Sequence, residues 1–185
     1  MNKRPTILAT RDAPQDHFRR VEEVDLEFSN GERRTFHRLH SGGHGAVLIV
    51  AMRDADTVLL VREYGVGIDS YELGAPKGRI DEGETAEQAA DRELKEEIGF
   101  GARSVQFLGT LSLSPSYMSH TIQVMLAQDL YPERLPGDEP EELEVVPWRM
   151  DKLHELIARD DVTDGRSIAA LFMAREFLAG RYRPS

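Results

Sequence analysis

Two short runs of hydrophobic residues in the first half of the chain predict buried β-strands. One run covers residues 46–52 and the other residues 57–62, and the polar residues 53–56 between them form a turn-like link. Continuous apolar runs of this length, bounded by turn residues, are typical of strands that are buried on both faces. Less continuous patterns predict further strands over residues 104–112, 121–128 and 143–148.

A helical pattern follows a stretch rich in glycine, residues 70–83, which we expect to form loops. Thr85 and Gln88 have the spacing of a capping box, and Gly99 stands where helices commonly end. Residues 85–98 are therefore predicted to form a helix. Two more helices are predicted over residues 151–159 and 166–179. Strands interleaved with helices indicate an α/β protein, built as a mixed sandwich.

Before residue 45 the pattern is that of a β-hairpin that stands apart from these elements. Hydrophobic residues alternate with polar ones up to Phe28, residues 29–31 supply a turn, and residues 33–39 return as a second strand. A two-stranded hairpin is rarely stable alone, so this one needs a packing partner. We therefore divide the chain into a strand-rich N-terminal arm, residues 1–44, and a main domain, residues 45–185.

The composition narrows the possible functions. The 185 residues include 23 Lys and Arg against 33 Asp and Glu, which gives a net charge of −10 at pH 7. This balance argues against nucleic acid polymers or anionic membranes as partners, although divalent cations can bridge acidic side chains to a nucleotide-sized substrate. The absence of cysteine excludes disulfides, thiolate nucleophiles and cysteine-ligated metals. No signal peptide or membrane-length apolar run is present, so we expect a soluble, cytoplasmic protein.

Carboxylates clustered on the first predicted helix are the main chemical signal. Each helical residue advances about 100°, so Glu93 and Glu97 point the same way and Glu96 lies on the flank of that face. Ala89 and Ala90 lie one turn earlier, where we expect their small side chains to leave room for a ligand. Like charges at this spacing destabilise a helix unless they meet a cation, and carboxylate oxygens suit the hard ions Mg²⁺ or Mn²⁺. A solvated acidic face is the alternative.

A longer motif surrounds this cluster. Gly78 is followed after five residues by Glu84, and after seven more by the sequence Arg-Glu-Leu-Lys-Glu-Glu-Ile-Gly-Phe, which ends at Phe100. This spacing reproduces the Nudix box at nine positions. Seven of them require one residue type, so chance agreement is on the order of one in 10⁸ per window. The chain therefore resembles the Nudix hydrolases.

The resemblance implies an α/β/α sandwich with a mixed sheet, in which the box forms a loop, a helix and a loop that hold a divalent metal. Members of the family hydrolyse nucleoside diphosphates linked to another group, and a metal-activated water attacks phosphorus. The resemblance implies metal ligands at Glu93, Glu96 and Glu97. It also implies a supporting role at that site for Glu84, a loop that approaches the metal at Gly78, and a structural role for Arg92.

A general base is also needed, because attack of water on phosphorus releases a proton. Relatives of the ADP-ribose type carry this base on a late loop, which corresponds here to residues 136–142. We expect Glu141 to take the role, with Glu139 as the second choice and a flexible surface loop as the alternative. Glu97 is expected to serve catalysis as well as metal binding.

Similarity outside the box indicates one group within the family. The segments VDLEFSNGERR, LLVREYGVG, SYELGAPKG, LSPSYMS and AQDLYPERLPGDEPE resemble the ADP-compounds hydrolase (NudE-like) group. That resemblance implies an enzyme that acts on ADP-ribose, NADH and diadenosine triphosphate and releases AMP. A Nudix-like domain that senses ADP-ribose without cleaving it is the alternative. Such domains usually lack one or more box carboxylates, whereas this chain has all of them.

The same resemblance implies contacts to the substrate from Arg62, His37, His44 and Tyr117. Arg62 is expected at the end of a strand near substrate phosphate, and Tyr117 is expected to stack on adenine. The two histidines flank the link between the arm and the main domain. The alternatives are an ordinary strand-end charge for Arg62, a half-buried tyrosine beside a loop for Tyr117, and plain polar surface for the two histidines. Relatives exchange their N-terminal strands between subunits, so we expect a homodimer, the alternative being a hairpin that folds back on its own core.

Overall fold

The computed structural model describes residues 4–10 and 19–184. Its strands are β1 (Arg19–Glu27), β2 (Arg33–Ser41), β3 (Ala46–Met52), β4 (Thr57–Gly65), β5 (Ser70–Gly74), β6 (Lys77–Arg79), β7 (Phe100–Ser112), β8 (Thr121–Pro132) and β9 (Glu144–Arg149). Its helices are α1 (Ala86–Glu97), α2 (Leu153–Leu156) and α3 (Gly165–Leu178), with a 3₁₀ turn, η1 (Met150–Lys152), before α2. None of the helices in these ranges has the length and apolar character needed to cross a membrane.

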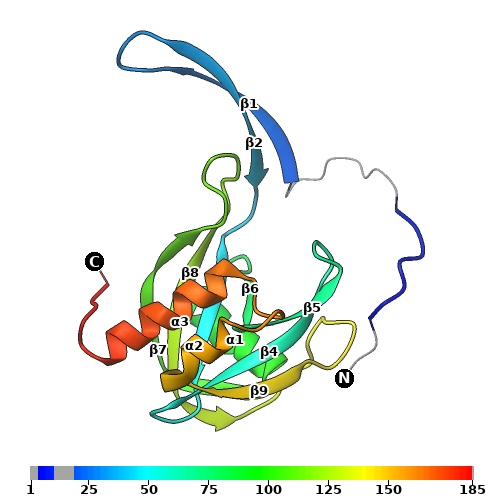
Figure 1. The fold of residues 1–185 in the computed structure, drawn as a ribbon, viewed down its shortest axis with the longest axis vertical. Coiled ribbons are helices and arrows are strands. Elements are labelled where there is room, and N and C mark those ends of the chain that lie inside the picture. The colour runs from blue at the N-terminus through cyan, green and yellow to red at the C-terminus, as the bar shows by residue number, and fades with distance from the viewer. Residues whose placement is uncertain (1–3, 11–18, 185) are drawn as a thin grey trace.

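Strands β3 to β9 form one mixed sheet, which makes up the body of the molecule (Figure 1). Neighbouring strands follow the order β5-β4-β3-β8-β7, while β6 also pairs with β3 and β9 with β4. The pairing of β3 with β8 is parallel, and the other pairs are antiparallel. The predicted strands over residues 46–52 and 57–62 therefore lie side by side in the centre.

The two faces of this sheet bury separate hydrophobic clusters, because successive side chains of a strand point to opposite faces. On β3, Val47, Ile49 and Ala51 belong to one cluster, together with Leu94 of α1. The alternate residues of β3 belong to the other cluster, together with residues of α2 and α3 such as Leu171. The sheet lies between α1 and the α2–α3 pair, which confirms the predicted α/β/α sandwich.

Helix α1 begins and ends where the sequence predicts. Thr85 is its N-cap: the Thr85 hydroxyl accepts a hydrogen bond from the backbone N–H of Gln88 (3.3 Å), and the Gln88 side chain accepts one from the backbone N–H of Thr85 (2.9 Å). Gly99, just past the end, has a φ of +75°, a left-handed conformation that glycine adopts at little cost. These two signals set the position of the helix that carries the glutamate cluster.

Two local predictions are wrong. Residues 70–83 are not all loop, because β5 pairs with β4 and β6 pairs with β3. Such short strands form because neighbouring strands offer backbone partners, which a local pattern does not reveal. The helix predicted over residues 151–159 shrinks to η1 and one turn of α2. Leu153 and Leu156 are the buried residues of that segment, and they lie one turn apart, so packing supports a single turn.

Ala89 and Ala90 do not leave room for a ligand, contrary to expectation. Both are fully buried in the cluster between α1 and the sheet. Their small side chains let the helix approach the sheet closely, and the glutamates project from a different part of the helix surface.

The N-terminal hairpin forms a sheet of its own, in which β1 and β2 pair along their whole length. Figure 1 shows it projecting from the body. Its base is joined to the loop after β7, since the backbone N–H of Leu39 donates to the carbonyl of Tyr117 at 2.7 Å. Residues 1–3 and 11–18 of the predicted arm lie outside the described residues. The division of the chain after residue 44 stays a prediction.

Candidate active site

Helix α1 presents three glutamates to a cavity whose opposite wall is the loop between β8 and β9. Glu93, Glu96 and Glu97 line this cavity, which has a volume of about 460 Å³, and the loop contributes residues 134–143. A second cavity of about 400 Å³ shares the same three glutamates and extends toward β6. The structure therefore brings the three predicted metal ligands together and sets an acidic loop against them.

Glu97 is a buried ionisable residue whose carboxyl group is not fully hydrogen-bonded within the described part of the chain. The residue is 7% exposed, and among the described residues its Oε2 atom has no hydrogen-bond partner. Burial raises the pKa of Glu97 to about 9; Lys77 opposes this effect, while repulsion from Glu93 and Glu63 adds to it. A buried carboxylate oxygen without a partner costs free energy, and a cation at that oxygen would offset the cost.

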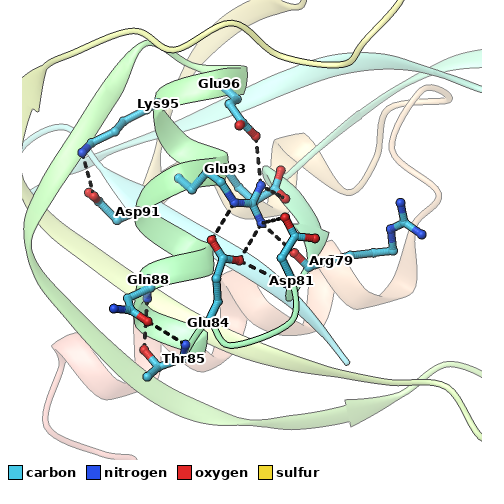
Figure 2. Close-up of polar contacts among 10 residues, drawn as sticks. Arg79, Asp81, Glu84, Thr85, Gln88, Asp91, Glu93, Lys95 and Glu96 are labelled. Carbon is cyan, nitrogen blue, oxygen red and sulfur yellow. Dashed lines mark hydrogen bonds and ion pairs between the residues drawn. The ribbon is translucent and has the colours of Figure 1, made fainter. Parts of the chain in front are cut away.

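Arg92 joins the other carboxylates of the motif. Its Nε and Nη2 donate to Glu84 at 2.9 Å each, and its Nη1 donates to Glu93 at 2.7 Å and to Glu96 at 3.0 Å. Figure 2 shows these three carboxylates turned toward one guanidinium. Nη2 also donates to the carbonyl of Arg79 at 2.9 Å, which links α1 to the end of β6. The bonds from Arg92 hold the pKa of Glu84 below its ordinary value.

Gly78 lies where β6 passes close to the glutamate face of α1. A Cβ at this position would overlap the carboxylate of Glu93. A side chain here would therefore displace either the strand or the carboxylate. The motif requires glycine at this place because the backbone and a site side chain approach so closely.

The chemistry of this donor set fits a hard divalent cation, since it consists of carboxylate oxygens. Within residues 4–10 and 19–184, however, no three Asp, Glu or His side chains are gathered at metal-binding spacing. Arg92 accounts for this, because it engages Glu93 and Glu96 and turns both carboxylates toward itself (Figure 2). The observation that favours a cation here is the buried Oε2 of Glu97, which has no hydrogen-bond partner in the part of the chain that the structure describes.

Two glutamates of the acidic loop face the cavities in different ways. Glu139 lines both cavities, and although the residue is exposed, partial burial of its carboxylate and repulsion from Glu63 and Asp138 raise its pKa. Glu141 lines the first cavity, and its Oε1 accepts a hydrogen bond of 2.5 Å from the hydroxyl of Tyr71. Glu141, the first choice for the base, is thus hydrogen-bonded to a tyrosine. Glu139, the second choice, lines both cavities that the three glutamates of α1 share, whereas Glu141 lines one of them.

Three residues that the sequence pattern does not predict belong to the surroundings of the site. Lys77 lines the second cavity, while Glu63 and Tyr71 are hydrogen-bonded to residues that line the cavities. Lys77 Nζ donates to Glu63 at 2.5 Å. Burial alone would lower the pKa of Lys77, but the charge and the hydrogen bond of Glu63, together with the charges of Glu97 and Asp164, outweigh this effect and raise the pKa. Lys77 directly precedes Gly78, so the motif could have indicated it. Glu63 and Tyr71 reach the site only through strand pairing, which no local signal predicts.

Arg62 lies outside both cavities. It is inside β4 and not at the strand end, because β4 continues to Gly65. Its neighbour Glu63 points to the α1 side, so alternation turns Arg62 to the other face of the sheet. There its Nε donates to Glu144 at 3.0 Å and its Nη1 to Asp161 at 2.6 Å. These ion pairs account for the position of the Arg62 side chain. That position does not support the expected contact between Arg62 and the substrate.

The other three residues expected to contact substrate lie apart from the glutamates. His37 is on β2, within the arm, where it pairs with a glutamate of β1. His44 lines a cavity of about 450 Å³ together with Arg79 and His120, and Arg79 also lines the second carboxylate cavity. Tyr117 is exposed in the loop after β7. Of these three residues, His44 is the one whose cavity adjoins the glutamate site.

Known proteins resemble this chain over nearly its full length. A model of the NUDIX domain matches residues 42–172, and a model of the NudE-type Nudix hydrolase N-terminal domain matches residues 5–38. The chain is 48% identical to the ADP compounds hydrolase NudE of Escherichia coli (strain K12), over 98% of this chain and 97% of that protein. It is 27% identical to the ADP-ribose pyrophosphatase of Bacillus subtilis (strain 168), over 82% of this chain and 80% of that protein.

A solved structure agrees with these matches. The crystal structure of an ADP compounds hydrolase superposes with a TM-score of 0.82 at 47% identity, covering 97% of this chain and 96% of that one. The similarity thus extends through the hairpin arm, the glutamate helix and the acidic loop. The chain belongs to the Nudix hydrolase family.

Proposed function

We propose that this Nudix hydrolase is a metal-dependent pyrophosphatase for ADP-containing compounds, namely ADP-ribose, NADH and diadenosine triphosphate. Its products are AMP and a second phosphorylated compound. The names of the similar proteins support this substrate class, and the glutamate-lined cavity supports the chemistry. The observation that carries the proposal is the buried Oε2 of Glu97, which lacks a partner among the described residues, so that a cation bound there would offset the cost of burying it.

Nudix hydrolases generally use divalent metal ions. For this chain we propose Mg²⁺, which Mn²⁺ can replace, with Glu93, Glu96 and Glu97 as the ligands. When bound, such a cation neutralises charge on the phosphate oxygens and makes water a stronger nucleophile. Arg92 and Glu84 keep the loop and the helix of the motif in register around it.

We assign the general base to Glu139 in preference to Glu141. Glu139 lines both cavities, whereas one oxygen of Glu141 accepts the hydrogen bond from Tyr71. In the reaction the oxygen of water bonds to phosphorus, and the bond from that phosphorus to the bridging oxygen breaks. A carboxylate oxygen of Glu139 accepts the proton of the water. Lys77, which lines the second cavity, adds positive charge on the side of β6.

Incubation with ADP-ribose and Mg²⁺, followed by chromatography of the nucleotides, tests this function. We expect AMP to accumulate, EDTA to abolish the reaction, and Glu97→Gln to reduce turnover about 10³-fold. Binding of ADP-ribose without release of AMP would instead support the non-catalytic sensing domain. Mass analysis of products formed in ¹⁸O-labelled water identifies the phosphorus that is attacked.

We also propose that the protein is a homodimer whose hairpin arms pack against the partner subunit. The arm forms a separate sheet that projects from the body (Figure 1). It exposes the large hydrophobic residues Val21, Leu26, Phe28 and Phe36, each between 42% and 55% exposed. An exposed hydrophobic surface on a two-stranded hairpin needs to be buried against another part of the protein or a partner subunit. The cytoplasmic location stays a prediction.

A further inference from the structure

A single hydrogen bond joins the acidic loop to the central sheet at Tyr71. The hydroxyl of Tyr71, on β5, donates to Oε1 of Glu141 at 2.5 Å, between residues 70 positions apart in the sequence. The bond to a carboxylate raises the pKa of Tyr71 to about 12, so the hydroxyl stays protonated and remains a donor at neutral pH.

Tyr71 presents this hydroxyl from a fixed position. It lies directly opposite Tyr64 in the antiparallel pairing of β4 and β5, and the two rings meet edge to face with centroids 5.6 Å apart. The hydroxyl of Tyr64 in turn donates to Asp69 at 2.5 Å, in the turn between the two strands. Leu73, two residues further along β5, is buried in the core. The strand pairing, the ring contact and the buried residue hold the Tyr71 side chain in place.

The loop itself has little regular structure to hold it. Residues 136–142 form neither helix nor strand. At one end of the loop, the backbone N–H of Leu135 donates to the carbonyl of Lys95 on α1 at 3.1 Å. Glu141 is separated from Glu139 by Pro140 alone, whose ring restricts the backbone between them. A restraint on Glu141 therefore also restrains Glu139, which lines both glutamate cavities.

We propose that Tyr71 is a positioning residue for catalysis. Its hydroxyl holds Glu141 and thereby keeps Glu139 facing the glutamates of α1. Glu141 is then the anchor of the loop, and Glu139 is the carboxylate that reaches the substrate. This inference rests on the proposed function, in which Glu139 accepts the proton of the attacking water.

Steady-state kinetics of Tyr71→Phe, with ADP-ribose and Mg²⁺, test the proposal. The change removes one hydroxyl and keeps the ring contact with Tyr64. We expect kcat to fall about tenfold, because the base is less often in place, while KM and the Mg²⁺ concentration for half-maximal activity stay unchanged. Tyr64→Phe is the matched control. It removes the neighbouring hydroxyl, whose bond stays within the β4–β5 hairpin, and should keep the wild-type kcat.

A double-mutant cycle separates the hydrogen bond from other effects. Glu141→Ala should lower kcat as much as Tyr71→Phe does, and the double variant should lose no more than either single one. If the fall in kcat of the double variant equals the product of the two single falls, the two residues act independently and the proposal is overturned. A wild-type kcat for Tyr71→Phe would also overturn it. An equal loss in Tyr64→Phe would overturn it as well, because the hairpin as a whole would then be responsible.

Hydrogen–deuterium exchange without substrate gives a readout that does not depend on the proposed function. We expect Tyr71→Phe to speed exchange in peptides that cover residues 136–142 and to leave α1 unchanged. Unchanged exchange in the loop would contradict the inference, even if the wild-type enzyme releases AMP. Faster exchange in an enzyme that releases no AMP would refute the proposed function, while the anchoring of the loop by Tyr71 would stand.

Discussion

Glu97 shows at the scale of one residue how stability and function oppose each other. Its carboxylate is buried, and one oxygen lacks a partner among the described residues, so the metal-free protein bears the cost of burying it. The neighbouring Glu93 and Glu96 both accept hydrogen bonds from the guanidinium of Arg92, which lowers the free-energy cost of burying their carboxylates. A residue that destabilises the fold in this way is typical of a site that awaits a ligand.

The first prediction concerns Glu97→Gln in the absence of metal. Because burial raises the pKa of Glu97 to about 9, the metal-free protein must protonate this carboxyl group to bury it at neutral pH. An amide of the same shape is neutral without that step, so we expect the melting temperature of the metal-free variant to equal or exceed that of the wild type. Added Mg²⁺ should stabilise the wild type, by about 2.7 kcal/mol at 100 times the Kd, and should not stabilise the variant. Thermal unfolding with and without Mg²⁺ measures both effects. A variant that melts lower yet keeps the full Mg²⁺ effect would refute the assignment of Glu97.

The second prediction concerns Gly78→Ala. The added methyl group overlaps the carboxylate of Glu93, so we expect kcat to fall by about tenfold or more, because a misplaced ligand at a reaction centre is costly. Gly165→Ala is the control, since nothing lies within 4 Å of a Cβ at that position. Steady-state assays of both variants decide the point, and equal activity in the two would contradict the close-approach argument.

The sequence predicts which residues share a face when their positions follow from helical spacing. It does not predict which residues come together through tertiary contacts. The spacing of Glu93, Glu96 and Glu97 predicts one shared face, and all three line one cavity. The same spacing predicts that Ala89 lies on that side, but the sheet covers it, because spacing alone does not say where the core lies. Tyr71 joins Glu141 only through the pairing of strands.

At the scale of elements, predictability follows the strength of the local signal. Helix α1 has a capping box at Thr85 and a left-handed Gly99, and both are found as predicted. Strands β5 and β6 have no comparable signal, because they form by pairing with β4 and β3, whose backbone groups are their partners. The acidic loop is recognisable by composition, but its attachment to β5 depends on the fold.

The third prediction concerns the ion pairs that join β4 to the loop before α3. Arg159 and Arg62 hold the pKa of Asp161 well below its ordinary value. The carboxylate of Asp161 therefore takes up a proton less readily in the folded state than in the unfolded state. The ion pairs stabilise the fold above about pH 4, and this stabilisation is lost as the pH falls further. We expect Asp161→Asn to lower the free energy of unfolding by about 1 kcal/mol at pH 7.

Urea unfolding at pH 7 and pH 3 measures this effect. The difference between Asp161→Asn and the wild type should be smaller at pH 3 than at pH 7. Asp160→Asn, at the exposed neighbouring residue, should match the wild type at both values. A difference that grows as the pH falls would have the wrong sign for a carboxylate with a lowered pKa.

At the scale of the whole molecule, the arm and the body differ in how far they bury their hydrophobic residues. The body buries two hydrophobic clusters, one on each face of its sheet. The arm is a two-stranded sheet whose large hydrophobic residues remain partly exposed. The sequence predicts both parts, and a two-stranded arm of this kind needs a packing partner.

The fourth prediction concerns the homodimer. We expect the wild type to have twice the chain mass of 20.9 kDa in solution. Phe36→Glu, on the exposed side of the arm, should shift it to the monomer. Val66→Glu makes the same kind of change in the turn after β4, on the body, and should leave the dimer intact. Light scattering after gel filtration gives the masses, and a monomeric wild type would refute the proposed dimer.

The central claim is that the glutamate face of α1 holds a divalent cation against a diphosphate. Anomalous diffraction from crystals grown with Mn²⁺ and a non-hydrolysable ADP-ribose analogue tests this most directly. We predict a Mn²⁺ peak within coordination distance of Oε2 of Glu97, beside Glu93 or Glu96, with the diphosphate of the analogue in contact with the ion. A bound analogue whose diphosphate lies elsewhere, with no peak at these glutamates, would contradict the account.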